Sequence, residues 1–194
     1  MKRFFFVVTV FKDVVIFSKP VSGASEQAMA RFLSRVRRAA GLRGQVVVLV
    51  AGNRELRALN RRFRHKDRPT DVLSFPSSQR RSPQTNLGAK LGRGRSSAKS
   101  TDAANQLAGD IAISAEIAIA NAARLGHRVA DELKTLILHG VLHLAGYDHE
   151  ADNGEMSEVE TRLRRELRLP DSLIQRNRVL PSHRRAGNLA GRRA

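Results

Sequence analysis

The segment HGVLHLAGYDH, residues 139–149, contains three of the six histidines of this 194-residue chain. Residues four apart lie above one another on one face of a helix, with Cβ atoms roughly 5–6 Å apart, so His139 and His143 can direct two imidazoles at one point. Gly146 can adopt the left-handed conformation that ends a helix, which lets the chain fold back and bring His149 to the same point. The spacing therefore predicts a helix that ends in a tight turn and places three nitrogen ligands around one metal ion.

The ligand set favours zinc in a catalytic site. Three protein ligands around a four-coordinate zinc leave one position for water, which distinguishes catalytic sites from structural ones. Zinc in such a site lowers the pKa of its water to about 7 and so provides a nucleophile at neutral pH. Three unrelated histidines are the alternative, but apolar residues surround this helix, and buried imidazoles need partners. We therefore expect one zinc ion per chain on His139, His143 and His149, and hydrolysis as the reaction class.

Composition narrows the choice of partner and compartment. The formal net charge is +17, which indicates a polyanionic partner, and nucleic acid is favoured over an anionic membrane surface. The chain lacks cysteine, which fits a reducing cytoplasm. Its N-terminus, MKRFFFVVTVF, is a poor signal peptide because Lys12 and Asp13 interrupt the apolar run. We expect a cytoplasmic protein that contacts neither membrane nor DNA.

Apolar patterning predicts an α+β fold, a small mixed sheet packed by helices with the metal-binding helix at its centre. Strands are expected at 4–10, 14–17, 45–51, 72–75 and 109–114. Helices are expected at 27–40, 53–63, 115–125, from about 131 through the histidine motif, and at 155–169. We expect an N-terminal extension at 1–13, one domain at 14–170, a disordered basic insertion at 77–108 and a basic tail at 171–194.

Three segments, HGVLHLAGYDH, RFRHKDRPTDVLSFP and GDIAIS, resemble in sequence and order the YbeY family of bacterial rRNA maturation endoribonucleases. The resemblance covers roughly Val14 to Leu169 and implies a zincin-like fold. It implies a zinc-dependent, single-strand-specific endoribonuclease that acts in the cytoplasm on the 3′ end of 16S rRNA and in ribosome quality control. Single-stranded rRNA and the small ribosomal subunit are the implied partners. The zinc ligands map onto the three histidines of the motif, and a functional arginine maps onto Arg64.

The basic turn around Arg64 suits cleavage of a phosphodiester, which adds negative charge to an anionic group and needs fixed cations. The guanidinium of Arg64 can hold two phosphate oxygens at once, and Lys66 and Arg68 can bind neighbouring phosphates. A solvated basic surface is the alternative. Attack by zinc-bound hydroxide and attack by the ribose hydroxyl both fit these residues. Asp148 and Glu150 flank the third histidine and are candidates to orient the ligands.

Two other functions remain open. The histidine spacing also matches the metzincin proteases, HExxHxxGxxH, but Gly140 replaces the glutamate that acts there as general base. A glycine lets a bulky substrate approach the metal, although helix packing can equally require a small residue. A non-catalytic ribosome assembly factor, stabilised by zinc, is the third hypothesis and needs a fourth protein ligand. One departure from the family concerns His65, which stands where glycine is usual and either narrows the pocket or is an exposed loop residue.

Overall fold

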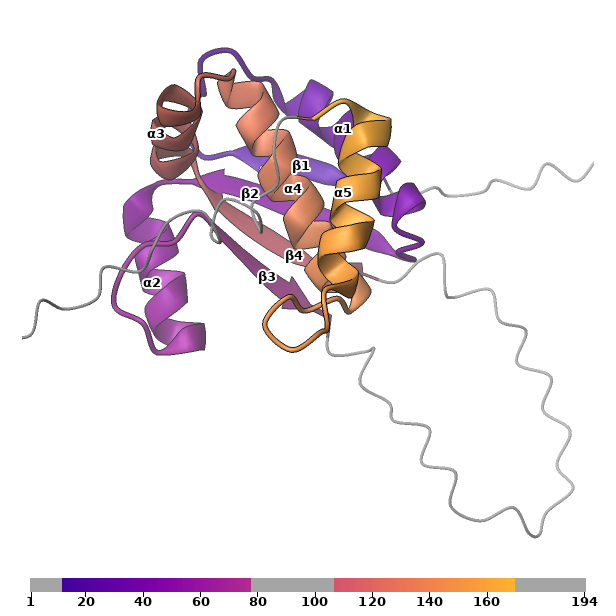
Figure 1. Cartoon of the computed structure of the whole chain (residues 1–194). Helices are drawn as coiled ribbons and strands as arrows, with labels where there is room; N and C mark the ends of the chain where they lie inside the picture. The colour runs from indigo at the N-terminus through magenta and orange to yellow at the C-terminus, as the bar shows by residue number, and fades with distance from the viewer. Residues whose placement is uncertain (1–11, 78–106, 170–194) are drawn as a thin grey trace, which may run out of the picture.

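The computed structural model describes residues 12–77 and 107–169. The expected strand at 4–10, most of the expected insertion at 77–108 and the expected tail at 171–194 lie outside the described residues. The elements follow in the order β1 (Val14–Phe17), α1 (Glu26–Ala39), β2 (Gln45–Ala51), α2 (Asn53–Arg64), β3 (Val72–Pro76), β4 (Leu107–Ser114), α3 (Ala115–Leu125), α4 (Val129–Ala145) and α5 (Glu155–Leu167) (Figure 1). The predicted α+β class is confirmed.

The four strands form one mixed sheet in the order β1-β2-β4-β3. Strands β1, β2 and β4 are parallel, and β3 pairs antiparallel with β4 at the edge. The apolar run QVVVLVA forms β2, an interior strand whose Val46, Val48 and Val50 are buried on one face of the sheet. An apolar strand without polar alternation is expected where helices or loops cover both faces. The sheet thus matches the predicted small mixed sheet.

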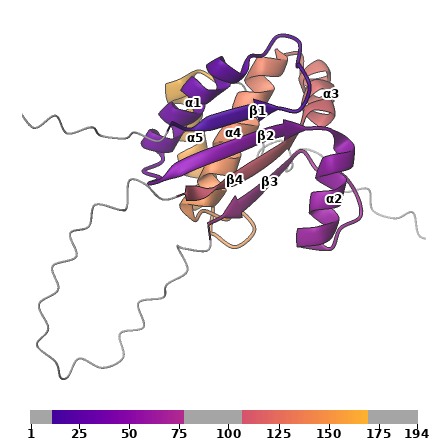
Figure 2. The same cartoon turned by 180° about the vertical axis from the view of Figure 1, so that it is seen from behind.

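Helices cover the two faces of the sheet unequally. Helices α1, α3, α4 and α5 lie on one face, and α2 lies on the other (Figures 1 and 2). Helix α4 is central, because it contacts α1, α3, α5, β3 and β4. Its fully buried apolar side chains are Leu133, Leu136, Ile137, Leu138, Val141 and Leu142. Among the described helices none has the length and apolar character needed to cross a bilayer.

Helix α3 has the predicted limits, which Ser114 and Gly126 set. The Ser114 hydroxyl accepts a hydrogen bond from the Ile117 backbone N–H at 3.1 Å and caps α3. Gly126 ends α3 in the left-handed region with φ 72°.

Strand β4 begins at Leu107, two residues before the expected start, so Leu107 and Ala108 belong to the sheet and not to the expected insertion. The apolar pattern is weak there because Gly109, which has no side chain, follows them.

Asp13, at the expected boundary of the domain, is buried and ties β1 to α1 and β2. Its carboxylate accepts hydrogen bonds from the Ser34 hydroxyl at 2.7 Å, from Arg37 Nε at 2.9 Å and from the Val46 backbone N–H at 3.0 Å. A buried carboxylate is tolerated when it is paired and hydrogen-bonded in this way. These bonds hold the start of β1 beside the start of β2.

Candidate metal centre

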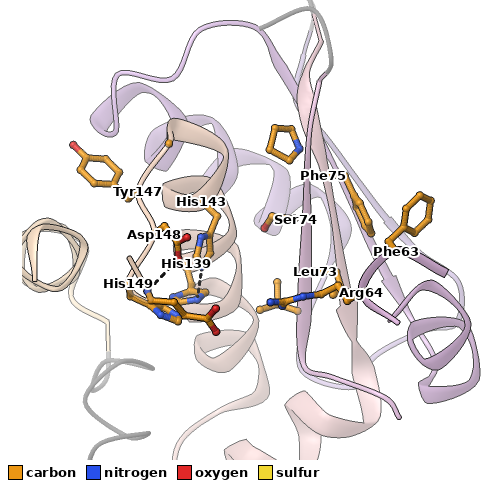
Figure 3. A pocket seen from close by; sticks show the side chains of 14 residues that line it. Phe63, Arg64, Leu73, Ser74, Phe75, His139, His143, Tyr147, Asp148 and His149 are labelled. Carbon is orange, nitrogen blue, oxygen red and sulfur yellow. Dashed lines mark hydrogen bonds between the residues drawn. The ribbon is translucent and has the colours of Figure 1, made fainter. Parts of the chain in front are cut away.

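The three histidines of the motif converge as predicted (Figure 3). The Nε2 atoms of His139 and His143 are 3.1 Å apart, and the ring of His149 has its centroid 5.2 Å and 5.3 Å from theirs. One nitrogen from each ring can be chosen so that all three lie within 4.8 Å of one another. Tetrahedral zinc with Zn–N bonds of about 2.0–2.1 Å needs ligand nitrogens about 3.3–3.4 Å apart. The donor set therefore fits one such ion after small side-chain adjustments.

The turn after α4 carries His149 to its position. Gly146 has φ 102°, a left-handed conformation that strains any residue with a side chain. Its N–H donates to the His143 carbonyl at 3.1 Å, and the Tyr147 N–H donates to the Leu142 carbonyl at 3.1 Å, which closes the end of the helix. The Asp148 carboxylate then accepts from the Glu150 N–H at 3.1 Å. Glycine is needed here for its backbone and not for space, because nothing lies within 4 Å of an added Cβ.

The metal group contains no carboxylate among the residues that the structure describes. A closed structural site would need a fourth protein ligand, and the group has three members, all histidines. The arrangement within residues 12–77 and 107–169 therefore supports three protein ligands and an open position.

Burial, and after it the neighbouring imidazoles of His139 and His149, lower the pKa of His143 from its ordinary value of 6.5 to about 4. At neutral pH His143 is therefore neutral, which is the form that can donate a lone pair to a metal ion.

The lowered pKa of His143 predicts an acid-sensitive stability of the metal-free protein. The unfolded chain takes up a proton near pH 6.5 that the folded chain takes up only near pH 4, so stability is lost as pH falls through this window. The full shift corresponds to about 3 kcal/mol, and partial exposure of the ring reduces the expected loss to about 1–2 kcal/mol. Urea unfolding at pH 7 and pH 4.5 should show a smaller loss for His143→Gln than for the wild type. A matched His65→Gln variant should behave as the wild type, and parallel losses in all three proteins would refute the prediction.

A buried carboxylate that the sequence reasoning missed lies behind the first ligand. Glu160 on α5 is fully buried, and its Oε2 lies 3.6 Å from Nδ1 of His139. Arg164, one helical turn later, places Nη1 3.8 Å from Glu160 Oε1. Asp148 and Glu150, the predicted candidates to orient the ligands, are exposed and line the cavity. The overlooked signal was a glutamate and an arginine four residues apart on the otherwise apolar face of α5.

The three imidazoles and Arg64 line the same cavity, which has a volume of about 700 Å³. Its walls come from the end of α2, from β3, from the last turns of α4 and from the turn that follows. Figure 3 shows the Arg64 side chain directed from α2 toward the histidines. Lys66 and Arg68 are exposed on the loop after α2 and are not among the residues that line the cavity. The structure thus brings together the predicted metal ligands and one of the three predicted cationic residues.

His65 is an exposed loop residue, and it does not narrow the cavity. It ends α2 in the left-handed region with φ 57°, and its backbone N–H donates to the Asn60 carbonyl. A side chain in this conformation costs about 1–2 kcal/mol, which explains why glycine suits the position. The backbone conformation, and not the imidazole, is therefore the feature that matters here.

Relief of this backbone strain gives a second prediction. His65→Gly should raise the free energy of unfolding by about 0.5–1 kcal/mol, since the relieved strain exceeds the entropy that glycine loses on folding. Urea unfolding measures the gain. His65→Ala removes the imidazole but keeps the strain, so an equal gain in that variant would contradict the explanation.

Gly140 packs against the sheet and does not open the cavity. A Cβ at this position would lie 2.9 Å from Ile111 Cδ1 and 3.2 Å from Ser74 Oγ, and the Ser74 hydroxyl donates to the Gly140 carbonyl at 3.3 Å. Of the two explanations for this glycine, close helix packing is supported and easier access for a substrate is not. A glutamate general base, as in the metzincins, would have to enter the packed layer between α4 and the sheet.

The matching family model and the similar sequences carry the same family name. The family model described as Endoribonuclease YbeY matches residues 13–168. The Endoribonuclease YbeY of Koribacter versatilis (strain Ellin345) is 50% identical over 163 residues, which are 84% of this chain and 91% of the relative. That of Solibacter usitatus (strain Ellin6076) is 39% identical over 84% of this chain and 92% of the relative. The solution structure of TM1509 from Thermotoga maritima is 26% identical, covers 79% of this chain and 91% of that chain, and has a TM-score of 0.47.

Proposed function

Because this chain belongs to the YbeY family of endoribonucleases, we propose that it is a zinc-dependent enzyme that cleaves single-stranded RNA. We propose that its substrate is the 3′ end of 16S rRNA, with a further role in ribosome quality control, and that it works in the cytoplasm on the small ribosomal subunit. The observation that carries the proposal is the common cavity of the three imidazoles and Arg64. The net charge of +17 supports a polyanionic substrate. We assign the activity to a domain at 14–170, with the extension, insertion and tail as appendages.

The three histidines would hold the ion, and their surroundings favour the neutral imidazoles and the ring orientation that metal binding requires. A bound zinc ion supplies a Lewis acid for a phosphoryl oxygen and lowers the pKa of a coordinated water to about 7. His143 is neutral at pH 7 and offers its lone pair. Glu160, which lies 3.6 Å from Nδ1 of His139, would keep the proton of that ring on Nδ1 and leave Nε2 for the ion.

Arg64 would bind the phosphate that reacts. Its guanidinium is charged at any working pH and can donate two parallel hydrogen bonds to phosphate oxygens, which stabilises the charge that develops during cleavage. Lys66 and Arg68, exposed outside the cavity, would bind phosphates farther along the strand. These three cations would orient the RNA so that one linkage lies in the cavity.

One experiment separates the three candidate functions. Zinc-loaded protein is incubated with a single-stranded RNA that carries the 16S 3′ end, with the same RNA annealed to its complement, and with an unfolded protein. We expect cleavage of the single strand alone, and loss of that cleavage in His139→Ala. Digestion of the unfolded protein would indicate a peptidase, and folded, zinc-loaded protein that cleaves neither polymer would indicate a non-catalytic assembly factor.

A further inference from the structure

An open aromatic ring lies beside the cationic part of the cavity. Phe63 immediately precedes Arg64 on the last turn of α2, is 52% exposed and lines the same cavity as the three histidines. Single exposed apolar residues are common on protein surfaces. This one differs because its neighbours hold it in place and because it adjoins the proposed phosphate ligand.

Two neighbours hold the Phe63 ring. It packs against the ring of Phe75 on β3, with centroids 5.0 Å apart and an interplanar angle of 64°. The Arg62 guanidinium carbon lies 5.2 Å from the centroid of the same ring. Figure 3 shows both phenylalanines on the side of β3 that faces away from the histidines, while Arg64 is directed toward them. The ring is thus supported on a helix and a strand, and about half of its surface remains open.

We propose that Phe63, supported by Phe75, is a stacking subsite for an unpaired nucleobase of the RNA whose phosphate binds Arg64. The inference rests on the proposed function, because it assumes that RNA occupies the cavity. Adjacent residues 63 and 64 offer an aromatic face and a cation, and a nucleotide offers a base beside a phosphate. Stacking on an aromatic side chain strengthens binding about 5- to 150-fold per base, equal to about 1–3 kcal/mol.

This subsite gives a physical reason for a preference for single strands. Bases within a duplex are already stacked on both faces and paired along their edges, whereas an unpaired base can turn out and stack on a protein side chain. A positively charged groove alone binds the backbone of either form. Phe63 would therefore favour single-stranded over duplex RNA, and the cations would bind the phosphates of both forms.

The test is a double-mutant cycle on binding affinity, in which the Phe63 side chain and one base of the RNA are removed separately and together. The ligand is a single-stranded oligonucleotide with 2′-O-methyl riboses and phosphorothioate linkages, which resists cleavage by either nucleophile. Further oligonucleotides of the same sequence each lack the base at one nucleotide, and together they cover every position. Fluorescence anisotropy measures the dissociation constants of the full-length, zinc-loaded wild type, Phe63→Leu and Phe63→Tyr.

We expect Phe63→Leu to weaken binding of the intact oligonucleotide at least 5-fold and Phe63→Tyr to preserve it. For one abasic position, the wild type and Phe63→Leu should bind equally within about 2-fold. Equal weakening of intact and abasic ligands by Phe63→Leu would overturn the subsite, and so would no weakening at all. If the wild type binds none of these ligands, RNA does not occupy the cavity, and the proposed function fails together with the subsite.

A second readout does not depend on affinity. The chain contains no tryptophan, so Phe63→Trp introduces a single indole at the proposed subsite. Stacking of a base on the indole should quench its fluorescence when the intact oligonucleotide is added. The oligonucleotide that lacks the stacking base should quench it much less. Equal quenching by both ligands would contradict a nucleobase at this position.

Discussion

Arg64→Ala should lower kcat/KM for single-stranded RNA about 10³-fold while zinc stays bound. The expected size is that of a lost cation or preorganised donor that stabilises charge developing on a transferred phosphoryl group. Arg64 is exposed on α2 and lies apart from the three ligands along the chain, so its removal should leave both the fold and the metal group intact. Single-turnover cleavage of a labelled RNA, with zinc quantified in the same sample, measures both effects.

Two variants make this prediction specific. Arg61→Ala removes an equal charge from the last turn of the same helix and should change kcat/KM less than about 3-fold, because Arg61 is exposed and does not line the cavity. Arg64→Lys keeps the charge but cannot donate two parallel bonds, so it should recover only part of the activity. If Arg64→Ala and Arg61→Ala lose activity equally, Arg64 contributes general charge and has no role in the reaction.

Chelation of the metal should both abolish cleavage and destabilise the fold. A ligand that binds only the folded state stabilises it by about 4 kcal/mol when its free concentration is a thousand times its dissociation constant. Two of the ligands lie on α4 and the third lies in the turn that follows it. A bound ion would therefore fix this turn to the end of the helix. Urea unfolding with excess zinc and with a chelator should therefore differ by about 4 kcal/mol, and added zinc should restore stability and cleavage together.

The control for this prediction is a variant with one ligand removed. In His143→Ala the difference between zinc and chelator should shrink below about 1 kcal/mol, because the remaining ligands bind zinc far more weakly. Wild-type protein that unfolds at the same urea concentration with and without zinc would refute the expected stabilisation of the fold by the metal. Cleavage that survives complete chelation would refute a role of the metal in the reaction.

Features determined by local patterns could be predicted from the sequence. Apolar residues with helical spacing gave α4, the conformational freedom of glycine gave the turn at Gly146, and the four-residue spacing gave the convergence of His139 and His143. The interior strand β2 has the predicted limits because its apolar run is bounded by polar and glycine residues. In each case the sequence pattern that indicates the feature lies within a short stretch of consecutive residues.

Features that depend on contacts between distant segments could not be predicted. Glu160 lies behind His139 because α5 packs on α4, and spacing within either helix does not encode this packing. The Phe63–Phe75 pair joins α2 to β3 in the same way. The packing role of Gly140 depends on Ile111, almost thirty residues earlier in the chain. The sequence pattern indicated Asp148 and Glu150 as candidates to orient the ligands, because they adjoin His149 in the chain.

The zinc content of the purified protein is the decisive measurement, because the proposed chemistry depends on one ion held by His139, His143 and His149. We expect elemental analysis to find close to one zinc per chain in the wild type and far less in His143→Ala, with both proteins folded by circular dichroism. Equal metal content in the two proteins, or a metal-free wild type that still cleaves RNA, would contradict it.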